Sequence, residues 1–568
     1  MRALLEKGSH PQPDSPFLSR DPRPRENRAE EASPSASYAG QEGLPHLLAH
    51  SRFGVGSGAG DSKRGPSPHP PMLYISLLLA LLAVACLIFV PNTVILLIFV
   101  AIVHGFAIYS ACHALLHKRD SRAALGWIAI ILFMPPVGLP LYWLFGIARI
   151  DSQAVRLMEK AAQKVMGGLV DLHGKSLTEK PEGFIDKDEV PHAWHYLVNP
   201  GSSITGRCML EGNDLTVLHN GEAAYPVMLK AISEARERVF LSSFIFGYDE
   251  VGKSFAAALR AAAERGCDVR LLMDGVGSFH LWPSWRKRLG PDVKLAYFLP
   301  PRLIPPQFSI NLRTHRKVLI CDGETGFTGG MNISQNHLAN LKRRSRVQDV
   351  HFRCLGPIAQ QLEIAFLMDW SFATGDHANF TVHPVKKQGS SLCRILMDGP
   401  GTPEDTILDL VCAQISAARH SVRIMSPYFL PPHRLHGELV SAVLRGVDVS
   451  VILPGENNHR LVDWAMRHQM PMLADRGVKI YRQPPPFAHT KLLLIDGEYT
   501  LLGSANLDPR SLNLNFELVM EVLDLRLAEQ LSAFYDEVRS RSVSVPTTYP
   551  ALPYRLRNAA SWIFSPYL

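Results

Sequence analysis

Two stretches of the chain share one pattern, His315-Arg-Lys-Val-Leu-Ile-Cys-Asp322 and His489-Thr-Lys-Leu-Leu-Leu-Ile-Asp496. Each contains a histidine, a lysine two residues later, an apolar run and an aspartate. After six further residues the first copy continues with Gly329-Gly-Met-Asn332, and the second with Gly503-Ser-Ala-Asn506. Two copies of one short motif, with glycine and asparagine at matching offsets, make coincidence negligible. We therefore expect this motif pair to define both the fold and the site.

The motifs belong to a longer repeat of strand, helical stretch, Arg-Gly turn and strand. Four apolar segments carry this repeat: Val239–Phe246 and Arg265–Leu272 in the first copy, and Val422–Phe429 and Arg445–Ile452 in the second. Alternating strands and helices indicate the α/β class, and only two copies exclude a solenoid. The sequence predicts a duplicated α/β fold with two pseudo-symmetric halves, residues 205–385 and 386–545.

The spacing within each motif has a geometric meaning. Residues two apart on a strand face the same side, so each histidine and its lysine are predicted to project together. The apolar run after each lysine predicts a buried strand, which Asp-Gly turns back as a hairpin. Asp322 and Asp496 therefore keep two open roles, as turn formers or as direct participants in the chemistry.

Two copies facing each other would place two imidazoles and two ammonium groups around one cavity. Imidazole serves as a nucleophile or proton carrier near neutral pH, and two lysines neutralise a phosphate without a metal. Asparagine amides can bond phosphate oxygens, and small neighbours allow close backbone approach. This set predicts phosphodiester transfer through a phosphohistidine, with no metal and no cofactor. The candidate catalytic residues are His315, Lys317, Asp322, His489, Lys491 and Asp496, and the candidate substrate-binding residues are Asn332, Asn506, Gly330 and Ser504.

The region before the repeat, residues 72–148, is predicted to be a membrane domain. Its first hydrophobic run, 72–116, contains no Asp, Glu, Lys or Arg and has room for two helices around Pro91-Asn92. The second run, 123–148, carries three prolines and predicts either a kinked span or a re-entrant hairpin. Basic clusters before, between and after the runs favour a multi-pass protein in the cell membrane with its catalytic domain in the cytoplasm. If the second run crosses the membrane fully, everything after it lies outside instead.

The remaining segments are predicted from composition. Residues 1–71 are rich in proline, glycine and charge and are expected to be disordered, and translation could begin at Met72. Residues 149–204 are expected to be a linker. The C-terminal segment, residues 546–568, mixes aromatic residues with arginine, which fits an amphipathic interfacial anchor and equally fits packing on the core.

Composition narrows the class of protein. Among 568 residues, 46% are hydrophobic and 20% charged, with a formal net charge of +7. This excludes a wholly disordered or fibrous chain, and the mild basicity suits an anionic lipid or nucleic acid. The eight cysteines include no Cys-x-x-Cys pair, so neither a disulfide framework nor a zinc site is indicated.

The paired motifs resemble those of the phospholipase D superfamily, and the resemblance extends over nearly all of 205–545. Local stretches are similar to those of bacterial cardiolipin synthases, as is the membrane segment Trp127–Gly146 with its Tyr-Trp-Leu-Phe-Gly. These stretches are Asp349–Arg353, Asp369-Trp370, Ser426–Pro431 and Asn506–Glu517. The resemblance implies a phospholipase D-like α/β sandwich with N-terminal transmembrane helices.

The resemblance also implies an activity. A histidine would attack the phosphorus of phosphatidylglycerol and release glycerol, and a second phosphatidylglycerol would then accept the phosphatidyl group to give cardiolipin. By family analogy His315 is the nucleophile and His489 the acid and base, while Asp349 and Glu517 orient the two imidazoles. The expected partners are phosphatidylglycerol and anionic membrane lipid, with no nucleic acid. Two alternatives remain: a membrane-bound hydrolase of phospholipid or nucleic acid, and a non-catalytic binding module.

Overall fold

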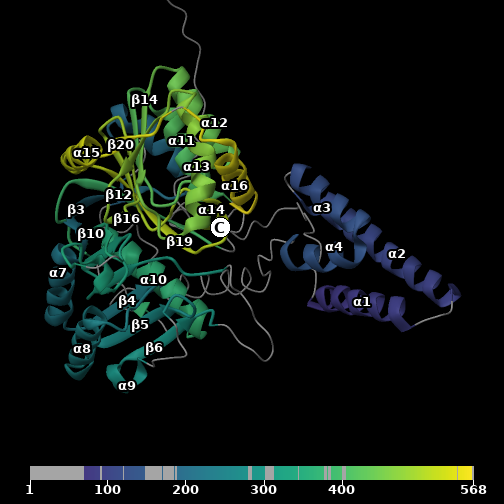
Figure 1. The fold of residues 1–568 in the computed structure, drawn as a ribbon. Coiled ribbons are helices and arrows are strands. Elements are labelled where there is room, and N and C mark those ends of the chain that lie inside the picture. Colours follow the sequence, from purple (N-terminus) through teal and green to yellow (C-terminus); the bar gives the residue numbers. More distant parts are fainter. Residues whose placement is uncertain are drawn as a thin grey trace, which may run out of the picture. The chain divides into compact units, whose positions relative to one another are not determined.

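The structure is a computed structural model (Figure 1). It describes residues 70–89, 93–118, 121–146, 169–170, 184–185, 189–278, 285–300, 312–342, 345–376, 380–381, 385–399, 405–546 and 548–565. The predicted disordered tail therefore lies outside the described residues, apart from its last two positions, which begin the first helix. Most of the predicted linker, 149–204, also lies outside them.

The first hydrophobic run forms two helices, α1 (Pro70–Phe89) and α2 (Thr93–His117). The break between them contains Pro91, which cannot donate a helical hydrogen bond, so the helices divide where the sequence predicts. Among the described residues, one helix is long and apolar enough to cross a membrane, namely Leu97–His117 within α2. The sequence predicts several transmembrane helices, and one helix among the described residues has the length and hydropathy of a membrane span.

The second hydrophobic run forms two short helices, α3 (Ser121–Phe133) and α4 (Pro135–Leu141), followed by a single π-turn. A 13-residue helix reaches only about 20 Å, less than the ~30 Å of a bilayer core. The two helices are in close contact at Gly138, where an added Cβ would lie 2.3 Å from the Ile130 carbonyl oxygen. Glycine at 138 is therefore required for α4 to fold back on α3, as in the re-entrant alternative.

Polar groups inside this helical region are paired. The Trp143 indole donates to Ser110 Oγ over 2.9 Å, and Tyr142 Oη lies 2.7 Å from His113 Nδ1. Pairing of this kind is what an apolar surrounding demands, since unpaired polar groups are costly there.

The predicted repeat is present in both halves. In the first half β4 (Arg238–Ser243), α8 (Glu250–Glu264) and β5 (Asp268–Asp274) follow one another, and the two strands pair in parallel. In the second half the same order is β13 (Ser421–Met425), α12 (His433–Leu444) and β14 (Asp448–Pro454). The glycine of each Arg-Gly turn has a positive φ, +95° at 266 and +90° at 446, which explains why glycine occurs there in both copies.

Most of the described strands form one large sheet whose order repeats about its centre. From one edge the described strands are β20 (Val543–Ser544), β15 (Lys479–Gln483), β14, β13, β17 (Leu492–Ile495), β18 (Tyr499–Gly503), β19 (Glu517–Leu523), β12 (Ser391–Asp398), β3 (Met209–His219), β10 (Val350–Leu355), β8 (Thr325–Gly329), β7 (Val318–Cys321), β4, β5 and β6 (Lys294–Phe298). Outward from the central pair β12 and β3, the strands from β19 to β15 are equivalent to those from β10 to β6, and β20 is an additional edge strand. The duplication predicted from sequence is thus confirmed at the level of the sheet.

Helices cover both faces of this sheet. In β4, Val239 and Leu241 belong to a core shared with α7 (Asn220–Glu234) and α8, whereas Phe240 between them packs with α10 (Ile358–Thr374). Alternate residues of one strand thus feed two layers, which is the signature of an α/β sandwich. The other described helices are α6 (His195–Thr205), α9 (Arg286–Leu289), α11 (Thr406–Ala417), α13 (Arg460–Ala474), α14 (Pro509–Asn513), α15 (Leu525–Ser540) and α16 (Leu552–Ile563).

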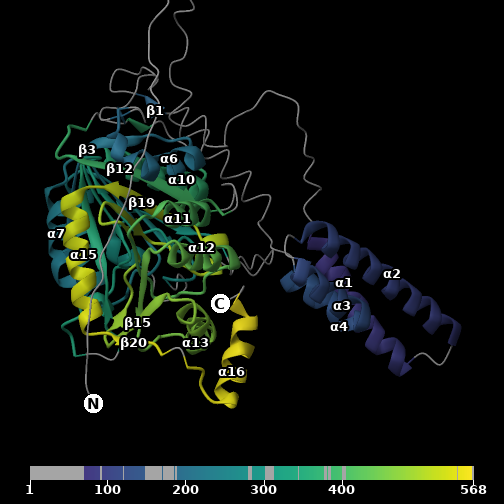
Figure 2. The ribbon, with the colours of Figure 1, turned by 90° about the horizontal axis from the view of Figure 1, so that it is seen from above.

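The two halves share a core as well as a sheet. One cluster of buried residues includes Cys354 and Phe366 from the first half and Cys393 and Met520 from the second. Figure 2 shows the strands of both halves running on from one another beneath the helices. The two halves therefore stabilise each other. The predicted domain limits at 205, 386 and 545 stay predictions.

Candidate active site

Each motif places its histidine and lysine just before a strand in the middle of its half of the sheet, β7 in the first half and β17 in the second. Both lysines are buried. Lys317 Nζ donates to the carbonyl of His315 over 2.5 Å, and Lys491 Nζ to that of His489 over 2.7 Å. Each pair projects to one side, as the spacing of two predicts.

The two halves are connected through the backbone on either side of this site. The His315 N–H donates to the Phe516 carbonyl over 2.9 Å, and the His489 N–H donates to the Gln348 carbonyl over 2.8 Å. Two short strands, β16 (Phe487–Ala488) and β9 (Val347–Gln348), pair in parallel at the second of these connections. Phe516 directly precedes Glu517, and Gln348 directly precedes Asp349. Each histidine is therefore held beside a carboxylate of the opposite half.

The imidazole–carboxylate pairs consequently cross between the halves. His315 Nδ1 lies 3.0 Å from the Glu517 carboxylate, and His489 Nδ1 lies 2.8 Å from that of Asp349. Both carboxylates are buried. A carboxylate on Nδ1 fixes the tautomer and leaves Nε2 as the nitrogen that can meet a phosphorus atom or a proton. The crossing joins all four side chains into one site.

The carboxylates have different surroundings. Glu517 accepts hydrogen bonds from the Ser504 hydroxyl and from Asn515 Nδ2, the latter over 3.1 Å. Asp349 accepts one from the Val350 N–H over 2.8 Å. Gly330 occupies the position equivalent to Ser504, and a Cβ there would lie 2.5 Å from the Asp349 carboxylate. Ser504 thus contacts one carboxylate and Gly330 leaves room for the other, while the predicted contact of either residue with substrate stays a prediction.

These surroundings set the charge of the carboxylates. Burial alone would raise the pKa of Glu517, but the neighbouring His315 and Lys317 and the Ser504 hydroxyl hold that pKa below its ordinary value. Burial raises the pKa of Asp349, and Lys491 offsets this only in part. Glu517 is therefore the more firmly ionised of the two carboxylates.

Burial also governs the histidines. It lowers the pKa of His315, and the adjacent Glu517 opposes that shift. Burial, reinforced by Lys491 and Lys317, holds the pKa of His489 well below its ordinary value. Both imidazoles are accordingly neutral in the free site at neutral pH, and an anionic phosphodiester would restore proton affinity to whichever ring must act as the acid.

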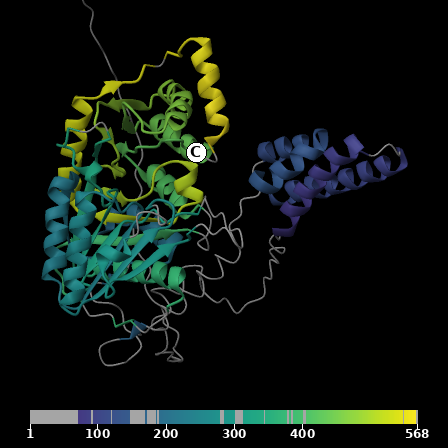
Figure 3. The same cartoon turned by 60° about the horizontal axis from the view of Figure 1, so that its bottom comes forward.

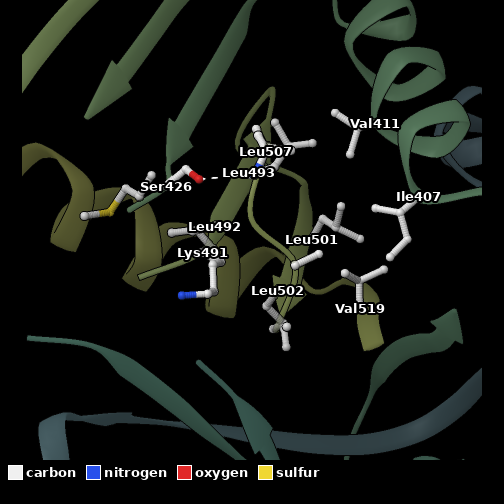
Figure 4. A pocket seen from close by; sticks show the side chains of 13 residues that line it. Ile407, Val411, Ser426, Lys491, Leu492, Leu493, Leu501, Leu502, Leu507 and Val519 are labelled. Carbon is white, nitrogen blue, oxygen red and sulfur yellow. Dashed lines mark hydrogen bonds between the residues drawn. The ribbon is translucent and has the colours of Figure 1, made fainter. Parts of the chain in front are cut away.

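The lysines are held at the edge of ionisation. Burial lowers the pKa of Lys317 to about 7 and that of Lys491 to about 8. Figure 4 shows the stem of Lys491 beside a small pocket lined almost wholly by apolar side chains, with its nitrogen pointing away from Ile407 and Val519. Lys491 is only 7% exposed, so its ammonium has little water around it. A bound phosphate would favour the charged form of both lysines.

The candidate asparagines are both buried. Asn332 Oδ1 accepts the Ile245 N–H over 3.2 Å, which leaves its amide nitrogen for a ligand. Asn506 Oδ1 has no hydrogen-bond partner within the described part of the chain. Contact of either side chain with substrate stays a prediction.

The structure places Asp322 and Asp496 away from the chemistry. Each lies at the opposite end of a four-residue strand from its motif's histidine and lysine, with a positive φ of +54°. Asp322 accepts three backbone N–H groups at residues 236–238, and Asp496 accepts three at residues 419–421. The geometry therefore favours turn formation over the direct catalytic role that the sequence also allowed.

Two residues next to the site were missed by sequence reasoning. Arg316 is buried and donates to Asp369, to the Glu517 carbonyl and to the Asp398 carbonyl, so it joins the halves. The sequence signal for Arg316 was its position between His315 and Lys317. Side chains alternate along a strand, so Arg316 must point away from those two residues.

His337 is the second missed residue. Its ring stands edge-on to His489 with centroids 6.0 Å apart, and its Nε2 accepts the Asn332 N–H. Its Nδ1 is buried without a partner in the described residues, and burial lowers its pKa to about 3. No motif marks this histidine in the sequence.

Across the described chain, no three His, Cys, Asp or Glu side chains are grouped as a metal would require.

Comparison with known proteins places this geometry in a family. A family model described as "Cardiolipin synthase, PLD-like domain" matches residues 228–370 and 411–539. Cardiolipin synthase A of Pseudomonas entomophila is 32% identical over 447 residues, which cover 78% of this chain and 92% of that protein. The chain belongs to the cardiolipin synthase family. It is therefore a phosphatidyltransferase-type enzyme of the phospholipase D superfamily, as the sequence predicts.

The chain is also similar to a second curated relative, to a further family model and to a solved structure. Cardiolipin synthase A of Pseudomonas putida is 32% identical over 76% of this chain and 88% of its own length. A model described as "Phospholipase_D-nuclease N-terminal" matches residues 105–146, which include most of α2 and all of α3 and α4. A solved structure, phosphatidylserine synthase of Haemophilus influenzae Rd KW20, aligns with a TM-score of 0.49 and 15% identity, covering 62% of this chain and 95% of that one.

Proposed function

We propose that this enzyme transfers a phosphatidyl group from one phosphatidylglycerol to another, giving cardiolipin and glycerol. The observation that carries the proposal is the crossed pair of imidazole–carboxylate contacts beside two buried lysines. Two histidines with separate carboxylates supply a nucleophile and an acid in one site, and two lysines supply charge for a phosphate. Membership of the cardiolipin synthase family gives the headgroup chemistry.

In the first step His315 Nε2 attacks the phosphorus of phosphatidylglycerol. A P–N bond forms, the P–O bond to the glycerol headgroup breaks, and His489 donates its Nε2 proton to the departing glycerol oxygen. Glu517 stabilises the charge that develops on His315, since their contact is 3.0 Å. Lys317 and Lys491 would face the oxygens of the five-coordinate phosphorus, where negative charge accumulates.

In the second step the terminal headgroup hydroxyl of another phosphatidylglycerol gives its proton to His489 Nε2. The resulting oxygen attacks phosphorus, a P–O bond forms and the P–N bond to His315 breaks. His315 returns neutral, and His489 returns protonated for the next turnover. Asp349, 2.8 Å from His489 Nδ1, keeps that ring oriented for both proton transfers. The assignment of His315 as the nucleophile follows the family analogy.

We also propose a multi-pass membrane topology. The apolar helices α1 and α2 would form a hairpin across the bilayer, and α3 with α4 would form a re-entrant hairpin, because neither is long enough to cross. Both ends of this arrangement lie on the basic, cytoplasmic side. Cysteines introduced at residues 92 and 119 and labelled from each side of sealed vesicles test it; labelling of both from the same side contradicts it.

A product assay tests the transfer. Purified enzyme in detergent, given phosphatidylglycerol as the only phospholipid and a metal chelator, is expected to form cardiolipin and glycerol in equal amounts. His315→Ala and His489→Ala should abolish both products. His433→Ala, which alters an exposed histidine outside the site, should not. Phosphatidic acid without cardiolipin would identify a hydrolase instead and would overturn the proposal.

A further inference from the structure

The C-terminal helix α16 has its polar and apolar faces reversed relative to an ordinary helix packed on a soluble domain. Asn558 and Ser561 are buried, 2% and 5% exposed, whereas Leu552, Leu556 and Ile563 are 62%, 62% and 69% exposed. Helices of soluble domains bury their leucines and expose their amides. The outward face of α16 is therefore suited to an apolar partner.

The exposed residues of α16 form a single stripe. At about 100° per residue, positions 552, 556 and 563 fall within about 40° of one another around the helix axis. The two buried polar residues lie on the opposite side of the axis. A stripe this narrow is a contact surface rather than a scatter of exposed side chains.

The inward face of α16 fixes the helix to α13. The Arg557 guanidinium stacks 4.5 Å over the Trp464 ring, and the rings of His468 and Trp562 lie 5.0 Å apart. Figures 1 and 2 both show α16 alongside α13, and Figure 3 shows it at the periphery of the second half. The stripe thus faces outward on a helix whose position is already determined by packing.

The chemistry around the stripe specifies an anionic lipid surface. Residues 549–564 contain two arginines and no Asp or Glu. The Arg555 guanidinium lies 5.1 Å over the ring of the exposed Tyr549, and Phe564 and Tyr554 are also exposed. Aliphatic side chains flanked by aromatic rings and arginines are the composition of helices that lie in a bilayer interface, where arginine meets lipid phosphates.

We propose that α16 docks in the interface of a bilayer containing anionic phospholipid, with Leu552, Leu556 and Ile563 inserted among the acyl chains. This gives the catalytic unit a membrane attachment of its own, in addition to the helices before residue 148. The attachment does not depend on which phospholipid reaction the site performs. Among the described residues, α2 contains a helix long and apolar enough to cross a membrane, so a bilayer is the apolar phase expected to be available to α16.

The direct test is depth-dependent quenching of a fluorophore on the full chain. The label is attached at Leu556→Cys, with Gln530→Cys on the exposed side of α15 as the matched control. Both carry His315→Ala so that the lipid is not consumed, and labelling of the native cysteines is subtracted with the same chain lacking the new cysteine. Vesicles contain brominated phosphatidylcholine with or without phosphatidylglycerol.

We expect the bromine atoms to quench the label at 556 about twofold or more above that at 530 in the phosphatidylglycerol vesicles, with the excess falling as salt rises. Equal quenching at the two positions would overturn the proposal. Crosslinking between two chains through position 556, without lipid quenching, would overturn it in favour of a second copy as the partner.

A functional test uses Leu552→Ser, Leu556→Ser and Ile563→Ser together, which alters only exposed side chains. Turnover in detergent micelles should stay unchanged, while turnover of lipid in vesicles should fall several-fold. Loss of activity in both media would show that the stripe supports the fold instead. Full activity in both would contradict a membrane role.

Discussion

The two halves of the catalytic unit match strand for strand from the central pair out to β15 and β6, yet they surround their carboxylates differently. Glu517 in the second half has Ser504 and Asn515 as extra donors, whereas Asp349 in the first half faces Gly330 and its own neighbouring N–H. The pKa of Glu517 is lowered and that of Asp349 is raised. Duplication thus preserved the scaffold, while a few side chains made the two acid–base pairs unequal, which suits one histidine for bonding to phosphorus and the other for moving protons.

Removing either histidine should cause the largest loss of activity. Either His315→Ala or His489→Ala is expected to lower kcat by roughly 10⁴-fold or more, because each step of the transfer needs both rings. The halves should differ in what accumulates. After prolonged exposure to phosphatidylglycerol, intact mass should reveal a slowly formed phosphatidyl adduct in His489→Asn, which retains the nucleophile, and none in His315→Asn. An adduct in the second variant alone would exchange the two roles.

Neutralising a carboxylate should have the next largest effect. Glu517→Gln and Asp349→Asn are each expected to lower kcat by roughly 10²–10⁴-fold, since the amide cannot stabilise an imidazolium and can select the wrong tautomer. Glu517→Gln should cost more, because Glu517 is the more firmly ionised. Steady-state rates of the two variants, with circular dichroism to verify folding, measure the difference. A larger loss in Asp349→Asn would reverse the order of the halves.

Exchanging the residues that contact the carboxylates should give intermediate losses. Ser504→Ala removes one hydrogen bond from Glu517 and is expected to lower kcat/KM roughly tenfold. It should also move the acid limb of the pH profile upward, because the pKa of Glu517 rises. Gly330→Ala places a Cβ against Asp349, displaces that carboxylate, and is expected to lower kcat roughly 10-fold to 100-fold without that shift. Identical pH profiles would mean that Ser504 does not tune Glu517.

The lysines should give the smallest and most graded effect. Because the pKa values of Lys317 and Lys491 are lowered to about 7 and about 8, their charged forms are present below these values and are lost as pH rises through them. kcat/KM, which reports the free enzyme, should therefore fall on the alkaline side of this window. Lys491→Arg keeps its charge, so its decline should begin at higher pH. An unshifted decline would assign it to another group.

Much of the fold was predictable because local patterns encode it. The apolar runs after Lys317 and Lys491, the Arg-Gly turns and the break near Pro91 each produced the expected element. Short-range chemistry of this kind depends on neighbours along the chain. The motifs also identified the two histidines and lysines that the structure gathers around one site.

The crossing of the site was not predictable from those patterns. His315 and Glu517 are 202 residues apart, and His489 and Asp349 are 140 apart. Which carboxylate meets which imidazole depends on the central pairing of β12 with β3, and no local signal encodes that pairing. The contacts of Gly330 and Ser504 with the carboxylates were not predictable for the same reason, and contact of either residue with substrate stays a prediction.

A gene duplication ordinarily leaves a spare, so that damage to one copy is covered by the other. The crossed contacts prevent one copy from replacing the other in this enzyme. A lesion at Asp349 disables the histidine of the second half, and a lesion at Glu517 disables that of the first. For evolution the two copies are a single unit of selection, bound to change together, and an engineer who wishes to split the enzyme must keep both pieces in one assembly.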